Sequence, residues 1–383
     1  MSNDIALYVH WPFCKSKCPY CDFNSHVRAD IDTAKWQSAY LREIDYFSDY
    51  LSDKNITSIF FGGGTPTLMP PVIAESIILQ ISKISNLVED AEITLEGNPT
   101  SVEAGKFKSF KSAGINRVSL GVQALNDDDL KFLGREHSAL EALKAVETAA
   151  SVFENYTFDL IYARPNQSLE NWESELRRAL KYISGHMSLY QLTIEKGTPF
   201  YSAYNKGKFN MPDSDFSADF YELTTDIMES QNMPAYEVSN HAVAGKESRH
   251  NMTYWRYGDY LGIGPGAHSR ISLNNNKYAG MMIHHPENWL DSVDKKGQGI
   301  QQKTKLSNDE IAEEMIMMGM RIKEGVSVKM LEKIAGRNKC EKILHNAKRL
   351  SEIGLLQSPE SKIAPTKKGL MLSNYLVSQL LVL

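Results

Sequence analysis

The segment from His10 to Phe23 decides the class of this chain, and its sequence is HWPFCKSKCPYCDF. It spaces Cys14, Cys18 and Cys21 as C-x3-C-x2-C, directly after a short stretch with β character. Thiolates are the usual protein ligands of iron–sulfur clusters. A cubane cluster has four irons, so three thiolates leave one iron without a protein ligand. The spacing therefore predicts a 4Fe-4S cluster whose open iron a small molecule can chelate.

Two other interpretations of these cysteines fit less well. A zinc site needs a fourth Cys or a His at ligand spacing. His10 and His26 flank the loop without forming a zinc-finger pattern, and the remaining cysteine, Cys340, is far along the chain. A disulfide framework needs an oxidising compartment and more cysteines in a shorter chain. The iron–sulfur interpretation is therefore favoured.

The composition is that of an ordinary globular protein with room for two or more domains. The chain has 383 residues, of which 42% are hydrophobic and 23% charged, and its net charge is −5. Acidic residues outnumber basic ones, 47 to 42, and no long Lys/Arg block occurs, so stable nucleic-acid binding is not expected. No secretion signal or membrane-length apolar run is found. We expect a cytoplasmic protein that is not a membrane protein.

Strand-like and helix-like segments alternate through the first half of the chain. Strands are predicted at residues 5–10, 56–61, 91–96, 116–120, 156–161 and 187–192, with helical patterns between them. This order predicts an α/β fold with a parallel sheet, most simply a partial (β/α)6 barrel. Such folds build their sites at the carboxyl ends of the strands.

Polar and glycine-rich residues fall at these strand ends. The cysteine loop, residues 62–65, Glu96, residues 121–123 and Asp159 all lie at or near the end of a predicted strand. Parallel strands bring their carboxyl ends to one edge of the sheet. The sequence therefore predicts a single pocket shared by these segments.

The pattern changes beyond Thr198, and three regions are expected. Residues 1–200 form the barrel, 201–300 an extension and junction, and 301–383 a smaller C-terminal α+β domain. Residues 199–211 are predicted as a loop and 213–231 as a helix. The C-terminal region has helices followed by a small hairpin and a last helix, an order typical of winged-helix modules. The excess of acidic over basic residues in the chain favours protein or substrate over DNA as the partner of this module.

Several further motifs agree in order and spacing with one family. They are YVHWPFC (8–14), FGGGTPT (61–67), EGNP (96–99), GVQ (121–123), LGR (133–135) and DLIY (159–162). Phe23, two places after Cys21, also matches the aromatic residue of the radical S-adenosylmethionine (SAM) signature. Over nearly its whole length the chain resembles radical SAM proteins of the HemN/HemW family.

The resemblance implies the cofactors and the residues that hold them. A 4Fe-4S cluster would bind to the three cysteines, and SAM would chelate its open iron. Reductive cleavage of SAM would give methionine and a deoxyadenosyl radical. Glycines suit a site where the backbone approaches a ligand closely. The positions matched to the SAM site are Tyr8, Phe23, Gly63, Gly64, Thr65, Glu96, Gln123, Arg135 and Asp159.

Two departures place the chain on the HemW side of the family. HemN-type dehydrogenases carry a further cysteine where this chain has Phe23, and an extra N-terminal segment, whereas seven residues precede Tyr8 here. The run HNMTYW at 250–255 matches the H-N-x-x-Y-W motif typical of the HemW type. The resemblance therefore implies a haem chaperone, with haem as cargo and a haemoprotein, unspecified but expected to be respiratory, as acceptor.

The H-N-x-x-Y-W motif has two interpretations. His250 would be the axial ligand of haem iron, with Tyr254 and Trp255 packing on the porphyrin face. Alternatively, these side chains are buried and fix the junction of two domains. His241 and His268 are rival ligands.

Two other functions remain in competition with haem transfer. One is an oxygen-independent coproporphyrinogen III dehydrogenase, which forms two vinyl groups by oxidative decarboxylation. The other is a redox or DNA-associated regulator that uses the cluster as a sensor. Haem binding, porphyrinogen turnover and salt-dependent DNA binding distinguish the three.

Overall fold

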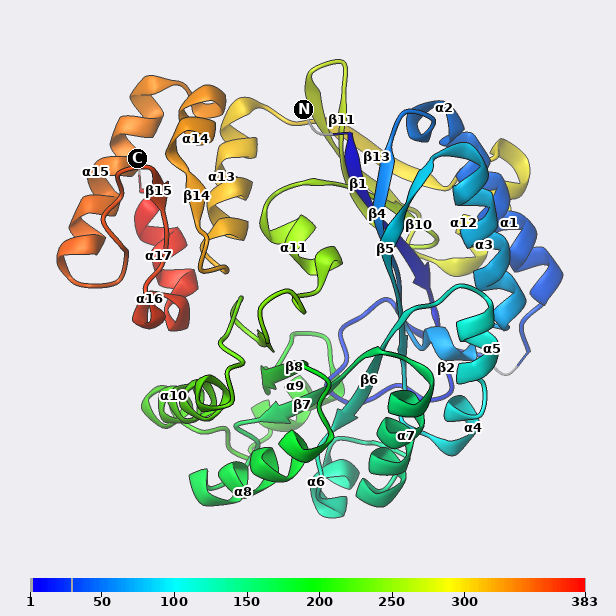
Figure 1. Ribbon diagram of the computed structural model, residues 1–383, viewed down its shortest axis with the longest axis horizontal. Helices are drawn as coiled ribbons and strands as arrows, with labels where there is room; N and C mark the ends of the chain where they lie inside the picture. Colours follow the sequence, from blue (N-terminus) through cyan, green and yellow to red (C-terminus); the bar gives the residue numbers. More distant parts are fainter. Residues whose placement is uncertain (1–2, 29, 383) are drawn as a thin grey trace.

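The computed structural model describes residues 3–28 and 30–382. Its centre is one large sheet with the strand order β13-β12-β11-β10-β1-β4-β5-β6-β7-β8-β9 (Figure 1). The six predicted strands are present as parallel neighbours, and the predicted α/β class is confirmed. The sheet is open, since β13 and β9 form its two edges. The six strands are β1 (Asp4–Trp11), β4 (Asn55–Gly63), β5 (Asn86–Gly97), β6 (Arg117–Gln123), β7 (Asn155–Tyr162) and β8 (His186–Gln191).

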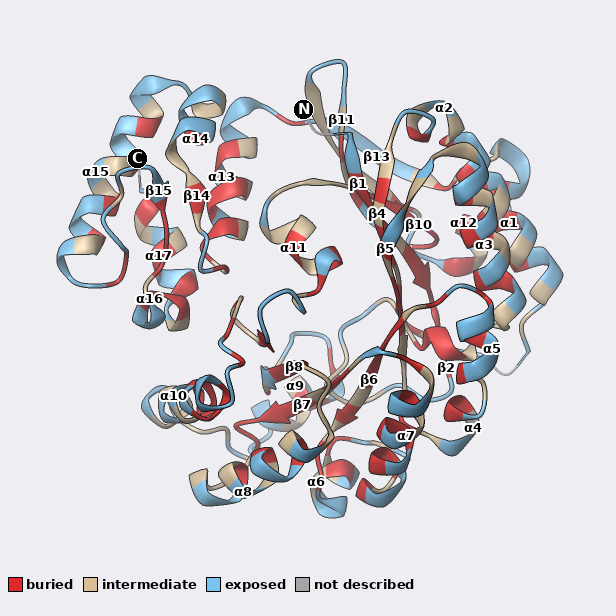
Figure 2. Cartoon of the chain, in the orientation of Figure 1, coloured by how far each residue is buried: buried red, intermediate tan, exposed pale blue. Residues whose placement is uncertain are grey.

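Helices cover the outer face of this sheet and bury one side each (Figure 2). Helix α7 illustrates why they form: Ser138 and Glu141 make a reciprocal capping box at its start, and small and branched apolar residues line its buried face. The principal helices of this layer are α1 (Thr33–Tyr46), α3 (Pro71–Ile84), α5 (Phe107–Ser112), α7 (Ala139–Val152) and α8 (Leu169–Ala179). Shorter elements are α2 (Ser48–Leu51), α4 (Ser101–Ala104), α6 (Asp127–Phe132) and two 3-10 turns, η1 (Pro66–Leu68) and η2 (Leu180–Tyr182).

The sheet extends beyond the six predicted strands on both sides. β10 (Asp259–Ile263) pairs parallel to β1, and β11 (His268–Leu273), β12 (Asn276–Met282) and β13 (Ile300–Lys305) follow antiparallel. On the other side β9 (Asn240–Ala242) pairs antiparallel to β8. The β11–β12 hairpin turns at Asn274 and Asn275, both with positive φ, a conformation that asparagine tolerates. Helices α11 (Arg249–Trp255) and α12 (Pro286–Lys296) connect these strands.

The loop predicted at residues 199–211 is wrong in its first half. Pro199–Asn205 forms helix α9, and the Thr198 hydroxyl accepts a hydrogen bond from the backbone of Tyr201. Threonine at the N-cap followed by proline at the first helical position is a favoured start, because proline presets the backbone angle and its missing N–H needs no partner there. The helix predicted at 213–231 is present as α10 (Ser214–Ser230).

The C-terminal region has an apolar core of its own, made by buried residues between Ala312 and Leu380. It lies to one side of the sheet, with α13 facing α11 (Figure 1). A short hairpin pairs Leu356 with Pro365, as the sequence suggested, but the single last helix is split into α16 and α17. The elements are α13 (Asn308–Gly319), β14 (Val326–Ser327), α14 (Val328–Ala335), α15 (Arg337–Glu352), β15 (Lys362–Ile363), α16 (Lys367–Met371) and α17 (Ser373–Leu380). The divisions at residues 200 and 300 stay predictions.

A buried carboxylate ties helix α1 to the extension of the sheet. Glu43 is fully buried, and it accepts hydrogen bonds from the backbone N–H of Gly264 (2.8 Å) and of Gly299 (2.8 Å) and from the indole of Trp289 (2.9 Å). Burial raises the pKa of Glu43 to about 7, against the opposite effect of these three donors. In the sequence this role is visible only as a charged residue on the apolar side of a predicted helix.

Replacing Glu43 with alanine should therefore destabilise the fold. Three buried N–H groups would lose their acceptor, and each unsatisfied donor costs roughly 1–3 kcal/mol. We expect the free energy of unfolding, measured with urea, to fall by about 3 kcal/mol or more. Glu75, exposed on α3, is the matched control, and Glu75→Ala should change stability little. An equal effect of both substitutions would contradict the assigned role.

Candidate functional site

The cysteine loop is delivered to the carboxyl edge of the sheet by β1. The chain continues from β1 into β2 (Phe13–Cys14), and after the loop β3 (His26–Val27) pairs with β2. Backbone hydrogen bonds from Gly64 to Trp11 (2.7 Å) and from Thr65 to Phe13 (2.8 Å) join this segment to the glycine-rich end of β4. The two predicted site segments are thus held against each other by main-chain contacts.

Each loop thiol has a different polar neighbour. Thr65 Oγ1 donates to Cys14 Sγ (3.4 Å), Arg135 Nη1 donates to Cys18 Sγ (3.3 Å), and Cys21 Sγ lies 3.9 Å from the hydroxyl of Ser25. Burial raises the pKa of Cys14 and of Cys21. Deprotonation of these thiols therefore needs a cationic partner, which a metal centre supplies.

Three thiolates from one loop are the donor set of a cluster with one open iron. Among residues 3–28 and 30–382, no three His, Cys, Asp or Glu side chains are arranged to hold one metal ion. Zinc needs its ligands to converge on one point. In a cubane cluster, by contrast, each thiolate binds a different iron, so the sulfurs stand apart.

A cavity of about 450 Å³ opens beside the three thiols and gathers nearly all of the predicted SAM positions. Tyr8 is the exception, because it lines a neighbouring cavity. The predicted residues that line the first cavity, called here the cluster cavity, are Cys14, Cys18, Cys21, Phe23, Gly63, Gly64, Thr65, Glu96, Gln123, Arg135 and Asp159.

Two glycines in this cavity have no room for a side chain. Gly63 has φ +113°, and a Cβ there would lie 2.6 Å from the imidazole of His10. A Cβ on Gly64 would lie 2.6 Å from the backbone oxygen of Phe13, which leads directly into Cys14. Both positions therefore require glycine, and both leave bare backbone facing the cavity.

Charges of both signs line the cluster cavity. Burial, with the charge of Asp159, raises the pKa of Glu96 to about 8, and burial raises that of Asp159 to about 6. Arg135 donates to the backbone oxygen of Gly121 (2.8 Å), while its Nε is buried and has no partner among the described residues. Gln123, at the end of β6, has a φ of +72°, an unusual conformation for a side-chain-bearing residue. Such a site suits a zwitterionic ligand with hydroxyl groups.

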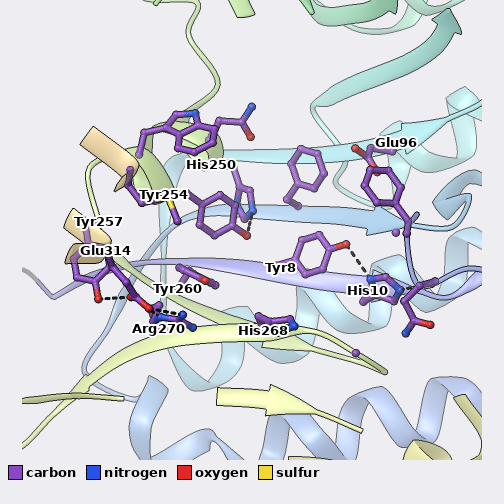
Figure 3. A pocket seen from close by; sticks show the side chains of 18 of the residues that line it. Tyr8, His10, Glu96, His250, Tyr254, Tyr257, Tyr260, His268, Arg270 and Glu314 are labelled. Atoms are coloured by element: carbon purple, nitrogen blue, oxygen red, sulfur yellow. Dashed lines mark hydrogen bonds and ion pairs between the residues drawn. The ribbon is translucent and has the colours of Figure 1, made fainter. Parts of the chain in front are cut away.

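A second cavity, of about 640 Å³, lies next to the first and shares Phe23, Gly63 and Glu96 with it. We call it the aromatic cavity. Figure 3 shows Tyr8, Tyr254 and Tyr260 along it, with His10 towards one end and the Arg270–Glu314 pair at the other. Its size falls within the roughly 300–1,000 Å³ of typical cofactor sites. Other residues that line it are Asn24, Phe60, His250, Asn251, Trp255, Tyr257, Gly266, His268, His284 and Met318.

His250 lies in this wall with both ring nitrogens engaged. Nδ1 lies 3.1 Å from the hydroxyl of Ser58 and Nε2 lies 2.8 Å from that of Tyr254, and the ring stacks on Phe60 at 4.8 Å. Burial lowers the pKa of His250 to about 3, so the imidazole is neutral. This geometry agrees with the interpretation of the motif as a buried structural element. Trp255 also lines the cavity, and its buried Nε1 has no partner in the described part of the chain.

The rival histidines are placed differently from each other. His268 is exposed and lines the aromatic cavity, whereas His241 is buried on β9 and is not among the residues that line it. Three residues of this lining were not expected from the sequence: Tyr260, Arg270 and Glu314. Tyr260 could have been found, because residues 236–268 are rich in aromatic and histidine residues. The Arg270–Glu314 ion pair could not, because its two residues are 44 positions apart in the sequence.

The open parallel sheet and the three-cysteine loop at its carboxyl edge define a radical SAM protein. The model of the Radical SAM superfamily matches residues 8–179, and that of the HemN C-terminal domain matches 306–372. The heme chaperone HemW of Bacillus subtilis is 33% identical, over 96% of this chain and 97% of that protein. The mouse "Radical S-adenosyl methionine domain-containing protein 1, mitochondrial" is 36% identical, over 85% and 75%.

The same fold occurs in a solved structure. Coproporphyrinogen III oxidase (HemN) from Escherichia coli superposes with a TM-score of 0.83, at 20% identity, over 99% of this chain and 90% of that one. The chain belongs to the HemN/HemW family of radical SAM proteins. Its cofactors are accordingly a 4Fe-4S cluster and SAM. Among the described residues, no helix has both the length and the apolar character needed to cross a bilayer.

Proposed function

We propose that this protein is a haem chaperone of the HemW type, which binds the cluster, SAM and haem and passes haem to an acceptor protein. The observation that carries the proposal is the aromatic cavity beside the cluster cavity. Relatives named heme chaperone HemW, 33% to 38% identical, support it.

The lining of the aromatic cavity matches the chemistry of haem. A flat apolar macrocycle needs aromatic faces, its iron needs an imidazole or a similar donor, and its propionates need a cation. Tyr8, Tyr254 and Tyr260 offer rings, and His268 and His284 offer imidazoles. Arg270 is the one Arg or Lys among the described residues of the lining. The C-terminal domain completes the wall through Glu314 and Met318 on α13.

The residues of the cluster cavity have distinct proposed roles. Cys14, Cys18 and Cys21 hold the cluster, which supplies an electron for reductive cleavage of SAM when both are bound. The bare backbone of Gly63 and Gly64 and the hydroxyl of Thr65 contact the methionine part of SAM. Phe23, which lines both cavities, and Tyr8, which lines the aromatic cavity, orient SAM together with four polar residues of the cluster cavity: Glu96, Gln123, Arg135 and Asp159.

The proposal places the protein in the cytoplasm, although several relatives are named as mitochondrial proteins. In this proposal the acceptor is a haemoprotein, and the chaperone makes at most transient contact with membrane haemoproteins.

Oxygen-independent coproporphyrinogen III oxidation is the second candidate. The observation in its favour is the border shared by the two cavities, at Phe23, Gly63 and Glu96, because these residues would hold SAM in the cluster cavity next to a ligand in the aromatic cavity. Phe23 in place of the cysteine expected for HemN-type enzymes argues against it.

One preparation, reconstituted anaerobically with cluster and SAM, tests both functions. Titration with haem should shift the Soret band with a saturating stoichiometry. Incubation with coproporphyrinogen III, SAM and a reductant should leave the porphyrinogen unchanged. Turnover to protoporphyrinogen would favour the second function, and the absence of any haem-dependent spectral change would overturn the first.

A further inference from the structure

Among the residues that the structure describes, four histidines line the aromatic cavity, and two of them already make hydrogen bonds through both ring nitrogens. His250 is bonded through both nitrogens, as described above. His10 is buried, and its Nδ1 lies 3.0 Å from the hydroxyl of Tyr8 while its Nε2 lies 2.9 Å from the backbone oxygen of Asn24. Either ring would have to break a buried hydrogen bond to bind iron, which costs free energy.

Phenolate ligation is also disfavoured in this cavity. Burial raises the pKa of Tyr8 and of Tyr254 above that of a free phenol, with additional contributions from neighbouring groups that include Glu96. A tyrosine must lose its proton to become a strong iron ligand, so these side chains are better suited to packing on a ring face.

His268 has the free lone pair that His250 and His10 lack. It is exposed, it lines the cavity, and its imidazole makes no hydrogen bond with any described residue. The walls of the cavity remove part of the water around its ring, and this partial desolvation, with the nearby Arg270 and His284, lowers its pKa, so the ring is neutral at neutral pH. A neutral imidazole is the form that coordinates metals.

The backbone at His268 is held firmly. The preceding turn has Gly264 and Gly266 at positive φ, with the N–H of Gly264 bonded to Glu43 and that of Gly266 bonded to the oxygen of Ile283 (2.9 Å). Ser269, the next residue, is buried and accepts a hydrogen bond from the backbone of Gly262 (2.9 Å). These contacts fix where the strand presents its first side chain.

Strand periodicity places His268 and Arg270 on the same face of β11. Alternate residues point to one side of a strand, about 7 Å apart at two residues' separation. Figure 3 shows both on the wall below the tyrosines, with His268 between His10 and the Arg270–Glu314 pair. Haem has iron at its centre and carboxylates at its edge. It therefore needs an iron ligand on the cavity wall and a cation further along the same wall, which is how His268 and Arg270 are placed.

We propose that His268, rather than His250, is the axial ligand of haem iron in this protein, with Arg270 positioned for the propionates. The inference rests on the proposed function. His284 is the nearest competitor. His284 lies after the end of β12, so strand pairing does not hold its backbone as it holds that of His268. Its ring lies beside that of His26, at 6.4 Å.

The test compares haem spectra of variants that retain the cluster. His268→Gly should lose the histidine-ligated resonance Raman and EPR signatures, and its haem affinity should fall by about ten-fold or more. Added free imidazole should restore the wild-type signatures, because it fills the space left by the ring. His285→Ala is the matched control, since His285 is an exposed neighbour outside the cavity lining.

The outcomes separate this inference from the proposed function. If wild-type protein binds haem and His268→Gly keeps the wild-type signatures, the inference is wrong although the chaperone function stands. Loss of the signatures in His284→Gly alone would assign the ligand to His284. If wild-type protein takes up no haem, the proposed function fails first. Equal iron and sulfide contents and equal unfolding temperatures would show that each variant is folded.

Discussion

Replacing Cys18 with serine should abolish the iron–sulfur cluster almost completely. The cluster has three protein ligands, and a serine hydroxyl is a poor ligand because it must lose a proton that it holds far more tightly than a thiol does. We expect iron and sulfide contents near background after anaerobic reconstitution, and no spectral response to added SAM.

Cys18 is the cleanest of the three positions for this experiment. Its side chain is half-buried, and the guanidinium of Arg135 donates a hydrogen bond to it from 3.3 Å away. Cys14, by contrast, is buried, and the segment that carries it is bonded to Thr65, so its replacement would also disturb the core. Loss of the cluster in Cys18→Ser can therefore be attributed to loss of the ligand.

Cys340 provides the matched control. It is buried in the core of the C-terminal domain, with Val328 as a weak hydrogen-bond partner at 4.0 Å. Cys340→Ser should keep full iron content while costing some stability, because it buries a more polar group. Full cluster assembly in Cys18→Ser, or its loss in Cys340→Ser, would contradict the assignment of the ligands.

The cluster cavity could be anticipated because its parts are local in sequence. Cys14, Gly63 and Glu96 each stand at the end of a strand whose apolar pattern is visible, and a parallel sheet brings such ends together without further information. The predicted strands and the shared pocket therefore needed no knowledge of tertiary packing.

The aromatic cavity could not be anticipated in the same way. Tyr8, Tyr260 and Glu314 come from β1, β10 and α13, and pairing of β10 with β1 is a contact between residues about 250 positions apart. The role of His250 depends equally on distance, because Ser58, 192 positions earlier, occupies its Nδ1. A motif displays residue types, but it does not display which of them are already bonded.

Removing the charge of Arg270 should weaken haem binding strongly. Arg270 makes two contacts with Glu314, Nη2 to Oε1 at 2.7 Å and Nε to Oε2 at 2.8 Å, and both side chains remain about one fifth exposed. A propionate can therefore reach the guanidinium and share it with Glu314. Charge-assisted hydrogen bonds contribute about 1.5–3 kcal/mol, which corresponds to roughly ten-fold to hundred-fold in affinity.

The same ion pair also joins the sheet to the C-terminal domain, so a structural effect must be separated from a binding effect. Arg256 and Glu324 form a second ion pair between these units, outside the cavity lining. Arg256→Gln is thus the matched control, and it should leave haem affinity unchanged. Glu314→Gln breaks the same ion pair as Arg270→Gln but leaves the cation of Arg270 in the cavity.

Comparison of Arg270→Gln with Glu314→Gln decides between the two roles of Arg270, because each substitution neutralises one partner of the pair. If Arg270 binds propionates, haem affinity measured by quenching of tryptophan fluorescence should fall well below the wild-type value in Arg270→Gln and stay close to it in Glu314→Gln, which keeps the cation. If Arg270 serves only to hold α13 against the sheet, both substitutions break the pair and should change haem affinity alike, and binding of propionates by Arg270 would be excluded. We expect the first result, because Arg270 is the one Arg or Lys that the described lining offers to an anionic edge.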